Sequence, residues 1–65
     1  MNLSTREKEV LALVAMGKPD KEIAATLCVS RRTVQTHMRR IFAKLQVSNR
    51  VAAAARYYSQ YAKLA

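Results

Sequence analysis

The chain has 65 residues and a net charge of +8 at pH 7, with 51% apolar residues, one glycine, one proline and no tryptophan. A domain this small buries only about 60% of the surface of its unfolded chain, so it has no room for a catalytic cleft. The alanine-rich composition favours helix, and no apolar run approaches the roughly 18 residues of a membrane-spanning helix. We therefore expect one soluble, cytoplasmic, all-α domain over residues 1–65.

Basic charge is concentrated in the later part of the chain. All four acidic residues lie within residues 1–22, where four lysines and arginines balance them, and residues 23–65 carry the other eight basic residues and no acid. Cations that neutralise phosphates release condensed counterions, so a one-sided basic surface on a small domain is typical of nucleic-acid binding.

The first helix is predicted from its start and stop signals. Ser4 followed by Glu7 has the spacing of a capping box, so we expect this helix to open at Thr5. Its apolar residues share one face: Val10, Leu11 and Val14. Gly17 can supply the left-handed turn that ends it.

A second, short helix is predicted to begin at Pro19 or Asp20, because proline needs no amide partner there and aspartate suits the N-terminal dipole. Its apolar stripe comprises Ile23, Ala24 and Leu27. Cys28, Val29 and Ser30 then form a three-residue turn, with Ser30 as the N-cap of the next helix. We expect Cys28 to be a small packing residue rather than a redox group.

The third helix, predicted from Arg31 to about Gln46, has two chemically different faces. The apolar face comprises Val34, Met38, Ile41, Phe42 and Leu45. The opposite face comprises Arg32, Thr36, Arg39 and Ala43, flanked by Gln35 and Arg40. A solvated helix usually mixes both signs of charge, and this face has no acid. We therefore expect it to lie against DNA, the alternative being that the arginines serve solubility alone.

The polar residue types on this helix match the chemistry of the major groove. Arginine recognises guanine O6 and N7, glutamine recognises adenine N6 and N7, and a threonine methyl can contact a thymine methyl. Two helices joined by a tight turn, the second presenting these side chains, have the layout of a helix-turn-helix motif. His37, at the edge of the apolar face, is expected to be a hydrogen-bonded packing residue rather than a metal ligand.

A fourth helix is predicted from near Asn49, capped by Ser48 or Asn49, toward Lys63. It carries two apolar stripes. One comprises Val51, Ala55, Tyr58 and Ala62, and the other comprises Ala53, Tyr57, Tyr61 and Leu64. One stripe can close the core while the other stays exposed in a monomer, and tyrosine is common in interfaces. We expect the second stripe to form a homodimer contact, the alternative being that its tyrosines belong to the core.

Short blocks of sequence in a fixed order extend over nearly the whole chain. They are Leu3-Ser4-Thr5-Arg6-Glu7-Lys8-Glu9-Val10-Leu11, Gly17, Lys21-Glu22-Ile23-Ala24, Val29-Ser30, Thr33-Val34, His37 and Lys44-Leu45-Gln46-Val47-Ser48-Asn49-Arg50. Together they resemble the LuxR/NarL-type helix-turn-helix domain. The resemblance implies a four-helix domain at the C-terminus of a transcription regulator, with a third helix that enters the major groove and a fourth that often pairs two subunits.

The resemblance also implies roles for individual residues. The residues implied to face bases are Gln35, Thr36 and Arg39, and those implied to contact phosphates are Ser30, Arg32, Thr33 and Lys44. We add Arg40 to the phosphate contacts, because it flanks the polar face of the third helix. The chain departs from the family pattern at Thr5, where proline is common, and at Gln46, where a left-handed glycine is usual. It departs again at Ala52, where an acid that can pair with Arg50 or Arg56 often stands.

We therefore expect a sequence-specific, double-stranded DNA-binding module of a bacterial transcriptional regulator, acting as a homodimer without a cofactor, a metal ion or a catalytic residue. One alternative is a sigma-factor-like domain that recruits polymerase, and another is a basic helical domain that lies on an anionic membrane. RNA polymerase is a further candidate partner. A receiver or ligand-binding domain, N-terminal to this chain, is a candidate source of the input signal.

Overall fold

The computed structural model describes residues 3–60, which form four helices and no strand. The helices are α1 (Thr5–Ala15), α2 (Asp20–Leu27), α3 (Arg31–Leu45) and α4 (Arg50–Gln60). All four predicted helices are confirmed, although the predicted extension of the fourth toward Lys63 lies outside the described residues. Within residues 3–60, no helix has both the length and the apolar character needed to cross a lipid bilayer.

Serine caps begin α1 and α3. The Ser4 hydroxyl accepts a hydrogen bond from the Glu7 amide at 3.1 Å, and the Ser4 amide donates to Glu7 Oε1 at 2.9 Å, so the predicted capping box is present. The Ser30 hydroxyl accepts from the Thr33 amide at 3.0 Å, which confirms the predicted cap of α3. Both caps satisfy amides that have no partner within their helix, and thereby fix where each helix starts.

Left-handed backbone follows each of the first three helices. Gly17 has a φ of 85°, Cys28 one of 58° and Gln46 one of 57°. The predicted glycine turn is confirmed, and Gln46 takes the conformation for which glycine is usual in the resembling family. Asn49, rather than Ser48, caps α4, because Asn49 Oδ1 accepts from the Ala52 amide at 2.8 Å.

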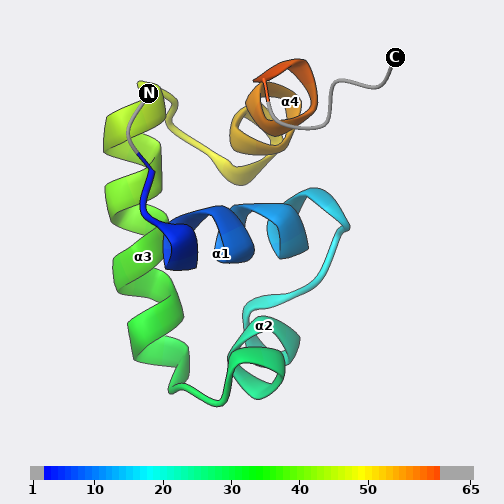
Figure 1. Ribbon diagram of the computed structural model, residues 1–65, viewed down its shortest axis with the longest axis vertical. Coiled ribbons are helices and arrows are strands. Elements are labelled where there is room, and N and C mark those ends of the chain that lie inside the picture. The colour runs from blue at the N-terminus through cyan, green and yellow to red at the C-terminus, as the bar shows by residue number, and fades with distance from the viewer. Residues whose placement is uncertain (1–2, 61–65) are drawn as a thin grey trace.

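The long helix α3 forms one side of the molecule (Figure 1). Helix α1 crosses it near the middle, α2 lies beside its N-terminal end, and α4 packs against α1. The buried hydrophobic core comprises Leu3, Val10, Leu11, Val14, Ile23, Ala24, Val34, Met38, Ile41, Leu45 and Ala53. The apolar faces predicted for the first three helices therefore point inward, except that Leu27 and Phe42 are only half-buried. This packing leaves the opposite face of α3 in solvent.

In α4, the residues that face the core belong to the apolar stripe that we expected to form the dimer contact. Ala53 is 0% exposed and Tyr57 is half-buried against the core, whereas Val51 is 78% exposed and Tyr58 is 53% exposed. The assignment of Ala53 to a dimer surface is wrong, because a side chain with no exposed area cannot reach a partner, and Tyr57 packs inward beside it. Both stripes are apolar, so their pattern does not determine which one faces the core. The other two residues of the predicted surface, Tyr61 and Leu64, lie outside the described residues.

Candidate nucleic-acid interface

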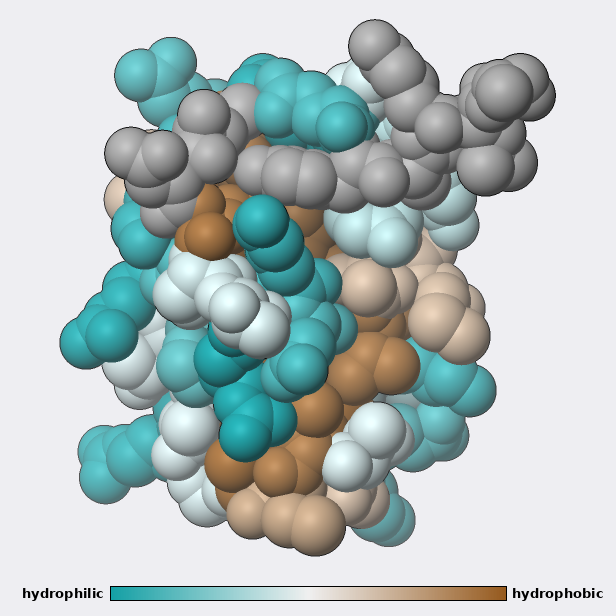
Figure 2. Space-filling view, in the orientation of Figure 1, coloured by the Kyte–Doolittle hydropathy of each residue, from teal (hydrophilic) through white to brown (hydrophobic). Residues whose placement is uncertain are grey.

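The exposed side of α3 carries Arg32, Gln35, Thr36, Arg39, Arg40 and Ala43, which we call the basic face. Thr36 is half-buried and the other five residues are exposed. No aspartate or glutamate occurs in α3. Hydrophilic side chains project along the edge of the molecule where α3 lies (Figure 2). The structure therefore brings together the predicted base-facing residues and two of the predicted phosphate-contacting arginines on one surface.

Helical geometry sets the reach of the basic face. Arg32 and Arg40 are two turns apart, which is about 12 Å along the axis. Gln35, Thr36 and Arg39 lie between them, with Thr36 and Arg39 three positions apart and therefore neighbours on the surface. A surface of this length can cover only a few base pairs, which is the span of one recognition helix in one half-site.

The Thr36 side chain is oriented by a hydrogen bond within α3. Thr36 Oγ1 donates to the Arg32 carbonyl oxygen at 3.1 Å, four residues earlier in the helix. Back-bonding of this kind uses the hydroxyl proton of a helical threonine. The γ-methyl group is therefore the part of Thr36 that remains for contact with a ligand, and its chemistry favours an apolar partner.

The N-terminal end of α3 has the features of an anion site. Ser30 Oγ and Thr33 Oγ1 lie 3.0 Å apart and share a hydrogen bond, and Ser30 also caps the helix. The first turn of α3 contains no acidic residue. Free amides and the positive end of the helix dipole attract phosphates at such termini. Ser30 and Thr33, two of the predicted phosphate-contacting residues, both lie at this end of α3.

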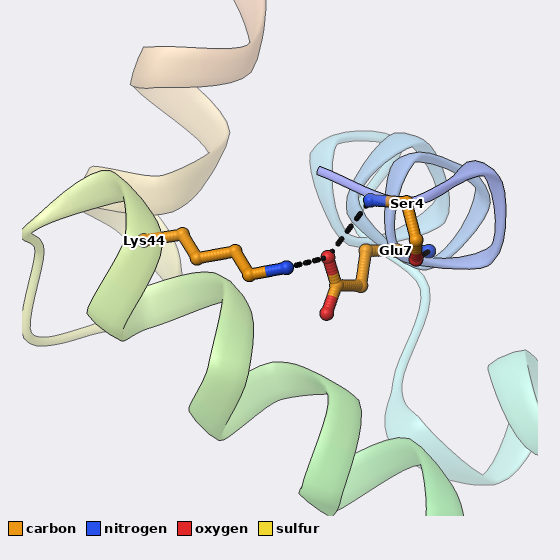
Figure 3. A network of polar contacts seen from close by, with 3 residues as sticks. All are labelled: Ser4, Glu7 and Lys44. Atoms are coloured by element: carbon orange, nitrogen blue, oxygen red, sulfur yellow. Dashed lines mark hydrogen bonds and ion pairs between the residues drawn. The ribbon is translucent and has the colours of Figure 1, made fainter. Parts of the chain in front are cut away.

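Lys44 pairs with Glu7, a contact that the sequence did not predict. Its Nζ donates to Glu7 Oε1 at 2.8 Å, and the same carboxylate oxygen accepts from the Ser4 amide (Figure 3). Glu7 is only 3% exposed and is the one buried charged residue within residues 3–60. The Lys44 hydrogen bond, followed by that of the Ser4 amide, lowers the pKa of Glu7 below its ordinary value although burial opposes this. The capping box predicted the Ser4 contact, but no local spacing pointed to Lys44, 37 residues away.

Two expectations about single residues need correction. Cys28, the left-handed residue that ends α2, is exposed, so it is not a packing residue. His37 is half-buried, and its Nδ1 is buried without a hydrogen-bond partner among the described residues. The expectation of a hydrogen-bonded histidine therefore fails at that atom. Neither residue lies on the basic face.

Gln35 and Arg39 border a shallow open groove beside the basic face. The groove is lined by Asp20, Gln35, Met38, Arg39, Phe42, Asn49 and Arg50. These residues come from α3 and from the N-terminal ends of α2 and α4, and they include the half-buried Phe42. Because Phe42 and Met38 support the groove, the stems of Gln35 and Arg39 have apolar neighbours on one side.

A four-helix arrangement with a turn between α2 and α3, and a basic exposed face on α3, defines the helix-turn-helix class of DNA-binding domain. Comparison with known proteins gives the family. The model for "Bacterial regulatory proteins, luxR family" matches residues 1–57. The chain belongs to this family, which consists of DNA-binding transcription regulators and not of enzymes.

Individual relatives agree with the family. The chain is 52% identical over 52 residues to the uncharacterized transcriptional regulatory protein YhcZ of Bacillus subtilis, covering 80% of this chain and 24% of that protein. It is 51% identical over 53 residues to the probable transcriptional regulatory protein NarL of Mycobacterium tuberculosis, covering 82% of this chain and 24% of that protein. The chain thus spans about a quarter of the length of these relatives.

The fold agrees with a solved structure as well. The response regulator ChrA of a heme-sensing two-component system superposes with a TM-score of 0.87 at 40% identity, covering 92% of this chain and 30% of that one. These findings favour a DNA-binding domain of a transcriptional regulator over a sigma-factor-like or membrane-surface domain.

Proposed function

We propose that the basic face of α3 enters the major groove of double-stranded DNA and reads a short sequence there. The observation that carries this proposal is the composition of that face: arginines, a glutamine and a threonine stand together in solvent with no acid among them. The base-reading residues are Gln35, Thr36 and Arg39. Arg39 suits guanine, Gln35 suits adenine, and the free methyl of Thr36 suits thymine.

Phosphate contacts surround these base contacts and hold the helix in register. Ser30 and Thr33 offer hydroxyl groups at one end of α3, and Arg32 and Arg40 flank the base-reading residues. Arg32 and Arg40 have no ion pair among the described residues, so their guanidinium groups can turn toward the DNA backbone without breaking a contact. Lys44 differs in this respect, because its ammonium group is bonded to Glu7.

Two copies acting together on paired half-sites fit the exposed stripe of α4. Val51, Ala55 and Tyr58 share one side of the helix and are all exposed. The Tyr58 hydroxyl donates to the Ala15 carbonyl oxygen at 2.9 Å, which ties the Tyr58 side chain to the C-terminal end of α1. Exposed apolar side chains of this kind are common at interfaces, where tyrosine keeps its hydroxyl wet. We place the homodimer contact on this stripe.

Selection of bound sequences from a random duplex pool tests the DNA-binding proposal. We expect a short motif that occurs twice, as two half-sites. Their centres should lie one or more helical turns of DNA apart, with roughly 10 base pairs in a turn. Recovery of duplexes with no shared motif would contradict sequence-specific reading. Recovery of single, unpaired motifs would contradict the dimer only.

The dimer surface is tested with charge placed on either side of α4. Ala55→Glu puts a carboxylate in the exposed apolar stripe, and Gln60→Glu puts the same group at an exposed position outside it. Sedimentation on the selected duplex should show two domains per site for the wild type and for Gln60→Glu, with weaker, non-cooperative binding for Ala55→Glu. Equal behaviour of the two variants would exclude this surface.

We place the domain within a larger cytoplasmic regulator. The solved relative is a response regulator of a two-component system. An N-terminal receiver or ligand-binding domain would then supply the signal, and RNA polymerase would be the machinery whose activity changes. Pull-down of polymerase by the full-length protein on promoter DNA, compared with the isolated domain, tests the second of these partners.

A further inference from the structure

We infer that Lys44 is a positioning residue, which holds α3 in its DNA-reading orientation through Glu7, and that it is not a phosphate ligand. The inference rests on the proposed function, because it concerns how the same basic face is presented. It reassigns a residue for which the family resemblance implies a phosphate contact.

The Glu7 carboxylate is a fixed, buried partner for Lys44. Glu7 Oε1 accepts hydrogen bonds from the Lys44 ammonium at 2.8 Å and from the Ser4 amide at 2.9 Å. The Glu7 side chain is 5% exposed, whereas the Lys44 side chain is 41% exposed and reaches inward from the last turn of α3 (Figure 3). The ammonium is therefore directed at a specific buried acceptor and not at the open solvent in front of the basic face.

A phosphate contact would break the bond between Lys44 and Glu7. Moving the Lys44 ammonium to a phosphate would leave the Glu7 carboxylate buried and without its cation. Loss of one partner from a buried ion pair is strongly unfavourable, because the remaining charge keeps its desolvation penalty. A lysine elsewhere on the surface gains a phosphate without this loss. The contact with Glu7 thus competes directly with DNA for the same cation.

Glu7 and Lys44 lie where a contact between them can orient α3. Glu7 lies in the first turn of α1, and Lys44 lies in the last turn of α3, five residues after Arg39. The contact joins α1 to the C-terminal end of α3, while the Ser30 cap and the packing of α2 hold the other end. Because Lys44 projects to the side of α3, its bond to α1 limits rotation of the helix about its own axis. Such rotation would turn Gln35 and Arg39 away from their bases.

Three variants and a matched control separate positioning from phosphate binding. Glu7→Gln removes the charge but keeps an oxygen for the Ser4 amide, so it leaves no buried ion behind and should fold. Lys44→Met removes the cation, and the double variant removes both. Arg40→Met is the control, because Arg40 is an exposed cation beside the base-reading residues with no partner among the described residues.

Affinity is measured for the selected operator and for a random duplex, each across a range of salt, with circular dichroism confirming that every variant is folded. We expect Glu7→Gln and Lys44→Met each to weaken operator binding by a similar factor of about five. In the double variant, the loss of affinity should be much smaller than the product of the two single factors, because both variants remove the same contact. In these variants, the slope of log affinity against log salt concentration (the salt slope) and the affinity for the random duplex should both stay near the wild-type values. Arg40→Met should weaken both duplexes alike and flatten the slope by about 0.9.

The opposite pattern would overturn the inference. If Lys44 binds a phosphate, Lys44→Met flattens the salt slope as Arg40→Met does, and Glu7→Gln leaves operator affinity unchanged or raises it by releasing the cation. The Glu7→Gln result decides the matter even if Lys44→Met fails to fold. Failure of the wild type to distinguish the operator from random duplex is a different outcome, which would contradict the proposed function itself.

Discussion

Arg50 and Asp20 fasten the first residue of α4 to the first residue of α2. Arg50 Nη1 donates to Asp20 Oδ1 at 2.8 Å, and Nη2 of the same guanidinium donates to the Lys18 carbonyl oxygen at 3.1 Å. Asp20 thus serves as the acidic partner of Arg50 in a chain that has alanine at position 52. The contact therefore joins two helix starts that lie 30 residues apart in the sequence.

Removing this guanidinium should lower stability. Both side chains are partly exposed, at 41% for Arg50 and 23% for Asp20, so solvent screens the pair. We expect Arg50→Met to lower the free energy of unfolding by about 1 kcal/mol, since two charge-assisted hydrogen bonds are lost. Urea unfolding measures this. Glu22→Gln is the matched control, because its pair with Lys18 is longer, at 3.8 Å, and more exposed, and its effect should be well below that of Arg50→Met.

Replacing Gln46 by glycine should raise stability. Gln46 ends α3 with a φ of 57° and a ψ of 47°, a conformation that costs a residue with a Cβ atom roughly 1 kcal/mol. Glycine escapes that cost but loses more entropy on folding, so we expect a net gain of about 0.5 kcal/mol. The control is Ala12→Gly inside α1, which should destabilise by about 1 kcal/mol. A loss of stability in both variants would mean that the Gln46 side chain makes a contribution larger than its backbone strain.

The sequence predicted most of this fold because its signals are local. Serine caps, the glycine turn and the apolar spacing of the first three helices each act within a few residues, so they specify helix boundaries and buried faces. The sequence could not predict which face of α4 points inward, because the helix has two apolar stripes. Only the burial of Ala53 in the core shows which stripe is inside. The pairs of Glu7 with Lys44 and of Asp20 with Arg50 are also beyond local reasoning, since each joins residues at least 30 positions apart.

Lowering the pH should reduce the stability of the domain, because it protonates Glu7. The Lys44 and Ser4 hydrogen bonds lower the folded-state pKa of this carboxyl, so the folded protein holds the ionised form more strongly than the unfolded chain does. This contribution is complete above the unfolded pKa of about 4.3 and is lost as pH falls toward the lower folded value. Urea unfolding from pH 7 to pH 3 should therefore show a smaller decrease for Glu7→Gln than for the wild type. Parallel curves would show that Glu7 titrates normally.

Thr36 should give the domain a preference for thymine over uracil, through contact with the thymine methyl group. With its hydroxyl proton donated to the Arg32 carbonyl, it offers a methyl to the groove. Replacing the contacted thymine by uracil should cost about 0.8 kcal/mol, or roughly fourfold in Kd, as expected for one buried methyl group. Thr36→Val should keep this preference and Thr36→Ser should lose it. A preference for thymine that survives in Thr36→Ser would assign the methyl contact to another residue.

Arg39 and Gln35 should carry specificity at single base pairs. We expect Arg39→Ala and Gln35→Ala each to lose roughly 1 to 3 kcal/mol on the operator and to relax the preference at one position. Competition binding with singly substituted operators measures this. Arg32→Ala, from the same face, should instead weaken all duplexes alike. Uniform losses for all three variants would mean that the basic face supplies charge without reading sequence.

The structure of the domain on its selected operator, from intermolecular NOEs or from crystals, is the most direct measurement of how the molecule works. We predict that Gln35, Thr36 and Arg39 contact base edges in the major groove, with Ser30, Thr33 and Arg40 on the flanking phosphates and Lys44 still bound to Glu7. A complex in which the basic face of α3 points into solvent while another surface holds the duplex would contradict the proposal at its centre.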